Sequence, residues 1–164
     1  MKHLLLIRHA KSSWDDPSLA DFDRPLNARG LRDAPFMGSL LKFRGLVPDQ
    51  IISSPARRAR DTAHILARAT GFNPADIDLR AEVYQARLPD LIALVRTLDD
   101  AWRRVYLIGH NPELMDLVDW LTGEAIDHLP TTGIASIEFP TESWAHIMES
   151  AGRLVWLDMP KRHL

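Results

Sequence analysis

The sequence contains no cysteine. This absence excludes disulfide bonds, thiolate-bound zinc, iron–sulfur clusters and catalysis by a cysteine nucleophile. It is compatible with a reducing compartment. Since a chain of 164 residues buries roughly two-thirds of the surface that its unfolded state exposes, we expect it to fold without a disulfide or a structural metal.

A surplus of positive charge is also missing. The 20 basic and 22 acidic side chains leave a formal net charge of −2. Proteins that bind nucleic acid usually carry a basic surplus, so we predict no nucleic-acid partner. Hydrophobic residues make up 46% and charged residues 26% of the chain, which is typical of a globular domain and not of a disordered, collagen-like or coiled-coil protein.

Long apolar runs are absent as well. The apolar run at residues 4–7 ends at Arg8, whereas a signal peptide needs an apolar region of ~7–15 residues and a membrane helix needs about 20. We therefore expect a cytoplasmic protein without a membrane partner. No repeat, low-complexity stretch or linker divides the chain, so residues 1–164 are interpreted as a single domain, and a monomer is favoured.

Short apolar runs alternate with amphipathic segments along the chain. The runs predict strands at 3–7, 51–53, 76–79, 105–108, 134–139 and 153–157. Apolar residues at helical spacing predict helices at 28–44, 54–70 and 88–102, and a fourth that Asn111 and Pro112 open. Pro35 predicts a late start or a kink in the first helix.

This alternation predicts an α/β fold. We expect three layers, in which helices cover both faces of a mostly parallel central sheet. The last two strands are expected to be antiparallel and at an edge of the sheet.

Three of the predicted strands end at polar residues. The first runs into Arg8 and His9, the second into a serine pair at 53–54, and the one at 105–108 into Gly109 and His110. In open α/β sheets, ligands bind outside the carboxyl ends of the strands. Because parallel strands place these ends at one edge, we expect the side chains to converge there.

Two predicted helix starts lie at the same edge. Ser54 with Pro55, and Asn111 with Pro112, are typical pairs of an N-cap and a first helical residue. The N–H groups of a helix N-terminus suit an anion, and Arg58, in the first turn, has a planar fork that matches phosphate oxygens. Each residue alone is explained as a structural histidine or a solvated arginine, but the combination favours a phosphate site.

These segments resemble the motifs of the histidine phosphatase superfamily, also called the phosphoglycerate mutase-like superfamily. Residues 4–10 resemble its apolar strand that ends in Arg-His-Gly, residues 53–63 its second motif, and residues 108–112 its third. Arg-His-Ala-Lys from position 8, Asp-Arg-Pro-Leu at 23–26 and Thr-Thr-Gly at 131–133 are similar to the SixA-type protein phosphohistidine phosphatases.

The resemblance implies a role for each matching position. His9 would be the nucleophile that becomes phosphorylated. Arg8 and Arg58 would bind the phosphate, and His110 would complete this catalytic pocket and contact the phosphate. Arg24, in the first loop, would be a further phosphate contact.

Three further positions, Ala10, Glu82 and Trp14, bear on the site. Ala10 replaces the glycine that usually follows the histidine, and a positive φ there would be costly for alanine. Glu82 is the candidate general acid, with an ordinary surface carboxylate as the alternative. Trp14 is a candidate for the border of the site, and the other tryptophans are interpreted as packing residues.

The resemblance implies a metal-independent phosphatase that forms a phosphohistidine intermediate. Its expected substrate is a phosphorylated protein that carries phosphohistidine, and no cofactor and no metal are expected. The seven histidines show no helical pair with a glutamate between, which disfavours a histidine-ligated metal hydrolase. A small-molecule phosphomonoester phosphatase or mutase, and a phosphate-binding module without catalysis, are the alternatives.

Overall fold

Six strands form one sheet in the order β3-β2-β4-β1-β5-β6 in the computed structural model, which describes residues 1–164. The strands are β1 (Lys2–Arg8), β2 (Gln50–Ser53), β3 (Asp78–Leu79), β4 (Arg104–Gly109), β5 (Ile134–Phe139) and β6 (Arg153–Asp158). The α-helices are α1 (Ala28–Phe43), α2 (Arg57–Thr70), α3 (Leu88–Arg96) and α4 (Glu113–Thr122). Short 3-10 helices lie between them, among them η1 (Asp21–Asp23) and η3 (Ala81–Val83).

The sheet is mostly parallel. Strands β1 and β2 each pair in parallel with β4, and β3 pairs in parallel with β2. Strand β5 runs antiparallel to β1, and β6 pairs antiparallel with β5 at the edge of the sheet. The predicted α/β class and the antiparallel closing pair are therefore confirmed.

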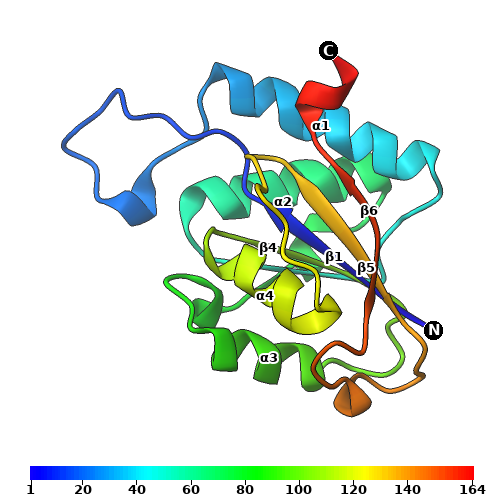
Figure 1. Ribbon diagram of the computed structural model, residues 1–164. Coiled ribbons are helices and arrows are strands. Elements are labelled where there is room, and N and C mark those ends of the chain that lie inside the picture. The colour runs from blue at the N-terminus through cyan, green and yellow to red at the C-terminus, as the bar shows by residue number, and fades with distance from the viewer.

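Helices cover both faces of this sheet, with α1 and α2 on one side and α3 and α4 on the other (Figure 1). Side chains of β1 alternate between the two faces, as strand geometry requires. Leu5 and Ile7 belong to the core under α1 and α2, whereas Leu4 and Leu6 belong to the core under α3 and α4. The three predicted layers are thus present, and β1 lies in the middle of the molecule.

Helix α1 begins earlier than the proline suggested. The Asn27 side chain accepts a hydrogen bond from the Gly30 N–H at 2.9 Å and caps the helix, which then continues through Pro35 to Phe43. Pro35 is exposed. Pro35 leaves the carbonyl of Leu31 without a helical partner. Because Leu31 is exposed as well, water can bind this carbonyl.

The other helices differ from prediction at their ends. Helix α2 begins at Arg57, because the Ser54 hydroxyl accepts a hydrogen bond from the Ala56 N–H at 3.2 Å in the turn before the helix and caps no helical N–H. Helix α4 begins at Glu113, and Asn111 does not cap it: the Asn111 amide nitrogen donates to the Leu129 carbonyl at 2.7 Å, while its Oδ1 accepts no hydrogen bond from the helix.

Helix α3 is shorter than predicted. It ends at Arg96 and not at residue 102, and the Asp99 carboxylate accepts a hydrogen bond from the Ala101 N–H at 2.8 Å in the turn that follows. Aspartate favours such local bonds over a continuing helix. No helix of the protein combines the length and apolar character needed to cross a membrane.

The sheet register places the ends of three strands side by side. Arg8 of β1 lies opposite Gly109 of β4, and Ser53 of β2 lies opposite Ile108 of β4. The residues that follow these strands therefore meet at one edge of the sheet.

Candidate functional site

A cavity of about 220 Å³ lies at this edge. Five of the six residues predicted for the site line it, namely Arg8, His9, Arg24, Arg58 and His110. They come from the end of β1, the first loop, the first turn of α2 and the end of β4, so residues distant in sequence share one small space.

The cavity has further lining residues that the sequence did not single out as ligands. Lys11, Ser12 and Thr131 border it, together with Asn111 and Trp14. Thr131 and Asn111 lie inside the segments that resemble the family's motifs, which was the available signal for them. Lys11 lies inside the Arg-His-Ala-Lys motif as well, whereas Ser12 follows that motif and its contribution depends on the path of the loop.

The backbone around His9 is fixed on three sides. The His9 N–H donates to the Gly109 carbonyl at 3.1 Å, and the Thr132 N–H donates to the His9 carbonyl at 3.1 Å. The next residue, Ala10, donates its N–H to the Thr62 hydroxyl at 2.9 Å. The non-glycine residues with positive φ do not include Ala10, so alanine is accommodated there without backbone strain.

The His9 imidazole is arranged as a nucleophile. Its Nδ1–H donates to the Ala10 carbonyl at 2.7 Å, so Nε2 keeps its lone pair. Burial lowers the His9 pKa to about 3, and the charges of Arg58 and Arg8 act in the same direction. Neutral His9 at physiological pH is the reactive form for attack on an electrophile.

Arg8 and Arg58 supply positive charge to the cavity. Burial, followed by the Arg58 charge, lowers the Arg8 pKa from its usual value. Arg8 Nη1 donates to the Leu129 carbonyl at 3.2 Å, and Arg58 Nη1 donates to the Asp21 carbonyl at 2.7 Å. The Nε atoms of both side chains are buried and have no hydrogen-bond partner in the protein.

His110 is held between Ser54 and Arg58. Its Nε2 lies 2.8 Å from the Ser54 hydroxyl, and its Nδ1 lies 3.5 Å from Arg58 Nη2. Because a guanidinium only donates, Nδ1 accepts and Nε2–H donates to the hydroxyl. Burial and then Arg58 lower the His110 pKa to about 4, so this ring, 5.1 Å from that of His9 between centroids, is uncharged near pH 7.

Arg24 is fixed in the long loop between β1 and α1, which Figure 1 shows projecting from the body of the molecule. Its Nη1 donates to the Ser12 hydroxyl at 2.9 Å, and its Nη2 lies 3.2 Å from an Asp21 carboxylate oxygen. Its Cζ lies 3.5 Å from the centroid of the Trp14 ring. Arg24 is therefore a buried cation of the cavity wall with little freedom to move.

Asp21 is a site residue that sequence reasoning missed. Its carboxylate accepts from Arg58 Nη2 at 3.0 Å and from the Tyr84 hydroxyl at 2.7 Å. Burial opposes ionisation, but the hydrogen bonds from Tyr84 and Arg58 outweigh it and lower the Asp21 pKa to about 2. Asp21 is one of several aspartates in a polar loop, so nothing local distinguished it.

Glu82 does not reach the cavity. In η3, Val83 is buried against Gly109, with Val83 Cγ1 3.3 Å from the position a Gly109 Cβ would take. The carboxylate of Glu82 points elsewhere and pairs with Arg80 at 2.6 Å beside a separate cavity. The structure therefore fits the alternative of a surface carboxylate and does not place Glu82 as a general acid.

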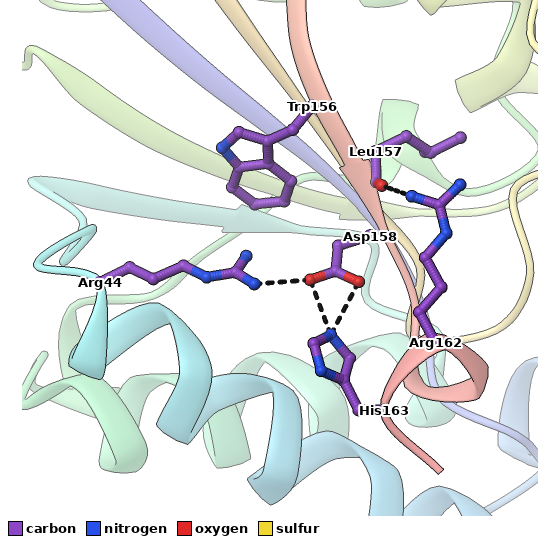
Figure 2. Close-up of a pocket in the computed structure, with 6 residues that line it drawn as sticks. All are labelled: Arg44, Trp156, Leu157, Asp158, Arg162 and His163. Atoms are coloured by element: carbon purple, nitrogen blue, oxygen red, sulfur yellow. Dashed lines mark hydrogen bonds and ion pairs between the residues drawn. The ribbon is translucent and has the colours of Figure 1, made fainter.

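A second cavity, of about 390 Å³, lies between α1 and β6 and is lined by the basic side chains of Arg44, Arg162 and His163 (Figure 2). The Asp158 carboxylate lies between Arg44 and His163. It accepts a hydrogen bond from Arg44 at 2.9 Å and lies 2.9 Å from His163 Nε2. Burial opposes ionisation of Asp158, but the hydrogen bond from His163 and others outweigh it and lower its pKa. The Asp158 carboxylate thereby bridges Arg44, which follows α1, and His163, and so attaches the C-terminal segment to the end of α1.

Comparison with known proteins relates the chain to one family. A family model described as the histidine phosphatase superfamily, branch 1, matches residues 4–84. An uncharacterised chloroplast protein of Arabidopsis thaliana is 32% identical over 94% of this chain and 74% of its own length. An uncharacterised protein of Mycobacterium tuberculosis is 31% identical over 94% of this chain and all of its own length.

Solved structures show the same relation. A protein of Agrobacterium tumefaciens assigned as phosphohistidine phosphatase SixA is 31% identical, with a TM-score of 0.82 over 97% of this chain and 98% of that chain. The protein histidine phosphatase SixA in complex with tungstate has a TM-score of 0.86 over 99% of both chains. At 21% identity, this second likeness shows the fold alone.

Proposed function

This chain belongs to the histidine phosphatase superfamily and to its SixA-type branch, and we propose that it removes phosphate from phosphohistidine in a protein, through a phosphohistidine intermediate on His9. It is a hydrolase of the phosphatase class. The observation that supports this mechanism best is the geometry of His9, whose Nδ1–H is bound to the Ala10 carbonyl while Nε2 has no hydrogen-bond partner, in a cavity that Arg8 and Arg58 also line.

The arginines are the proposed phosphate ligands. A phosphoryl group between Arg8 and Arg58 would meet fixed positive charge and the two Nε–H donors that lack a partner in the protein. Preorganised charge of this kind stabilises the equatorial oxygens as the group transfers. Since the arginines provide this charge, we propose a metal-independent reaction, and chelation of divalent cations is expected to leave the rate unchanged.

In the first step, His9 Nε2 attacks phosphorus and the bond from phosphorus to the leaving nitrogen breaks. The leaving nitrogen keeps the bonding electron pair, and a substrate ring that is protonated on its other nitrogen departs as neutral imidazole. The Ala10 carbonyl stabilises the positive charge that develops on the His9 ring. In the second step, water attacks the phosphorus, the bond from phosphorus to His9 Nε2 breaks, and Nε2 regains its electron pair. The protons of the water leave with the phosphate, and neutral His9 is restored.

The absence of an acid at the leaving group favours a phosphorus–nitrogen bond over an alkyl ester. Asp21 is ionised at neutral pH, with its pKa lowered to about 2, and Glu82 lies outside the cavity. An alkoxide leaving group needs a proton that neither carboxyl can give. Imidazole needs none, which agrees with a phosphohistidine substrate.

The test compares wild type with His9→Ala on a phosphohistidine protein and on phosphoglycerates. We expect an acid-labile phosphoenzyme in wild type, a loss of at least about 10³-fold in kcat for His9→Ala, and slow turnover of the phosphoglycerates. His64→Ala, a half-buried histidine of α2 outside the cavity, is the matched control and should behave as wild type.

Two results would contradict the proposal. Undiminished activity of His9→Ala would show that His9 is not the nucleophile. Equal or faster turnover of phosphoglycerates, or their isomerisation, would favour the small-molecule phosphatase or mutase.

A further inference from the structure

Trp14 is an exposed aromatic residue on the wall of the cavity. It is 72% exposed, whereas the other four tryptophans are buried or half-buried. It is also the single hydrophobic residue among the ten that line the cavity. An indole with most of its surface in water beside a charged site gains little from burial, which points to a role in binding.

Contacts with neighbouring residues fix the position of the indole. The Arg24 guanidinium covers one of its faces, with Cζ 3.5 Å from the ring centroid, and Arg24 is itself fixed by Ser12 and Asp21. The base of the loop is closed by the Ser13 N–H, which donates to the Pro25 carbonyl at 2.8 Å. Because the side chain is mostly exposed, its other face remains open.

The in-line geometry of phosphoryl transfer places the leaving group on the side of the cavity where Trp14 lies. His9 is 7% exposed and attacks from the buried end of the cavity, and the leaving group must lie on the opposite side of phosphorus. That side is the mouth, which Trp14 borders. The cavity, at about 220 Å³, is smaller than the roughly 300–1,000 Å³ of sites for larger ligands, which suits a phosphoryl group with one ring.

We propose that Trp14 is a stacking platform for a flat ring attached to the transferred phosphoryl group. The platform rests on the proposed function and adds a selection for planar leaving groups to it. A flat ring stacks on the open indole face and gains both buried area and favourable ring geometry. A phosphorylated aliphatic group of similar size gains only part of this.

The kinetic test uses two substrates with the same kind of bond. Phosphoimidazole and phosphoramidate both contain a phosphorus–nitrogen bond, but only the first has a ring. In Trp14→Ala we expect kcat/KM to fall about tenfold for phosphoimidazole and to stay within about twofold for phosphoramidate. Trp14→Phe should retain most of the phosphoimidazole rate. Phe43→Ala, at the far end of α1 and 91% exposed, is the control.

A binding test makes the outcome independent of turnover. By calorimetry, phenylphosphonate should bind wild type about tenfold more tightly than methylphosphonate, and Trp14→Ala should lose this difference. If the phenyl advantage persists in Trp14→Ala, or if both substrates lose activity equally, the platform is refuted. If wild type shows the phenyl advantage but hydrolyses neither substrate, the platform stands while the proposed function fails.

Discussion

At the scale of single residues, environment separates the two site histidines from the other five. His9 and His110 are the histidines that lie in the cavity, where burial and neighbouring arginines lower their pKa values to about 3 and about 4. Desolvation penalises the charged form of a histidine. Neutral imidazoles at pH 7 are thus a property of these two positions and not of the residue type, and His9 alone of the two keeps a nitrogen without a partner.

Asp21 has an effect on phosphate binding that can be measured. Its carboxylate, 3.0 Å from Arg58 Nη2, competes with a bound anion for that donor and repels it. We expect Asp21→Asn to strengthen inhibition by orthophosphate several-fold, because the amide keeps the shape and removes the charge. The Arg58 Nη1 bond to the Asp21 carbonyl should preserve the position of the guanidinium.

The matched control for this change is Asp61→Asn. Asp61 pairs with Arg57 at 3.5 Å outside the cavity, so it should leave the inhibition constant unchanged. Weaker phosphate inhibition in Asp21→Asn would mean that the carboxylate mainly orients Arg58.

At the scale of elements, the site depends on how strand ends meet the first turn of α2. Thr62 connects them, since its hydroxyl accepts from the Ala10 N–H at 2.9 Å and donates to the Arg58 carbonyl at 2.7 Å. It is fully buried. One side chain thereby sets the distance between the nucleophile's strand and the helix that carries a phosphate ligand.

Replacing Thr62 by valine should destabilise the protein. The Ala10 N–H would lose its partner in a buried position, which costs about 1–3 kcal/mol, as measured by denaturant unfolding. Thr70→Val is the comparison, because the Thr70 hydroxyl only donates to helix carbonyls and its removal leaves no N–H unpaired. Equal losses for both variants would argue against the connection through Thr62.

At the scale of the whole molecule, the central sheet joins both cores. Strands β1 and β4 contribute alternate residues to each, with Leu107 on one face and Tyr106 and Ile108 on the other. If β1 or β4 unfolds, apolar residues of both cores become exposed to water. We therefore propose that residues 1–164 form one domain that unfolds in a single transition.

Lowering the pH should reduce the free energy of unfolding at pH values above those at which the carboxylates titrate. The pKa values of His9 and His110 are lowered from 6.5 in the folded protein, so below pH 6.5 the unfolded chain binds protons that the folded chain does not. The free energy of unfolding should then fall with pH, by on the order of 2 kcal/mol per pH unit near pH 5. Denaturant unfolding between pH 7 and 5 measures this slope.

His9→Gln provides the control for that slope. It removes one of the two buried titrating rings, so the pH dependence should be about half as steep in this variant. A wild-type stability that does not change between pH 7 and 5 would contradict the burial of neutral histidines.

Local patterns were sufficient to predict the strands, the layers and the edge where the site lies. An apolar run such as residues 4–7 is recognisable without its neighbours, and parallel strands end at one edge whatever their order. The meeting of Arg8, His9 and His110 follows from these two facts, and Arg58 joins them because its helix starts just after β2. The resemblance to a known family then supplied the roles that we propose for them.

Other features depended on contacts between distant parts of the chain. Asp21 reaches Arg58 across 37 positions and Tyr84 across 63, and Ser54 meets His110 across 56. The same dependence moved the start of α4, where Asn111 binds Leu129, and turned Glu82 away from the cavity. A side chain's partner in such cases is set by the path of a loop through space, so only the folded arrangement decides whether a polar residue caps a helix, pairs on the surface or faces the substrate.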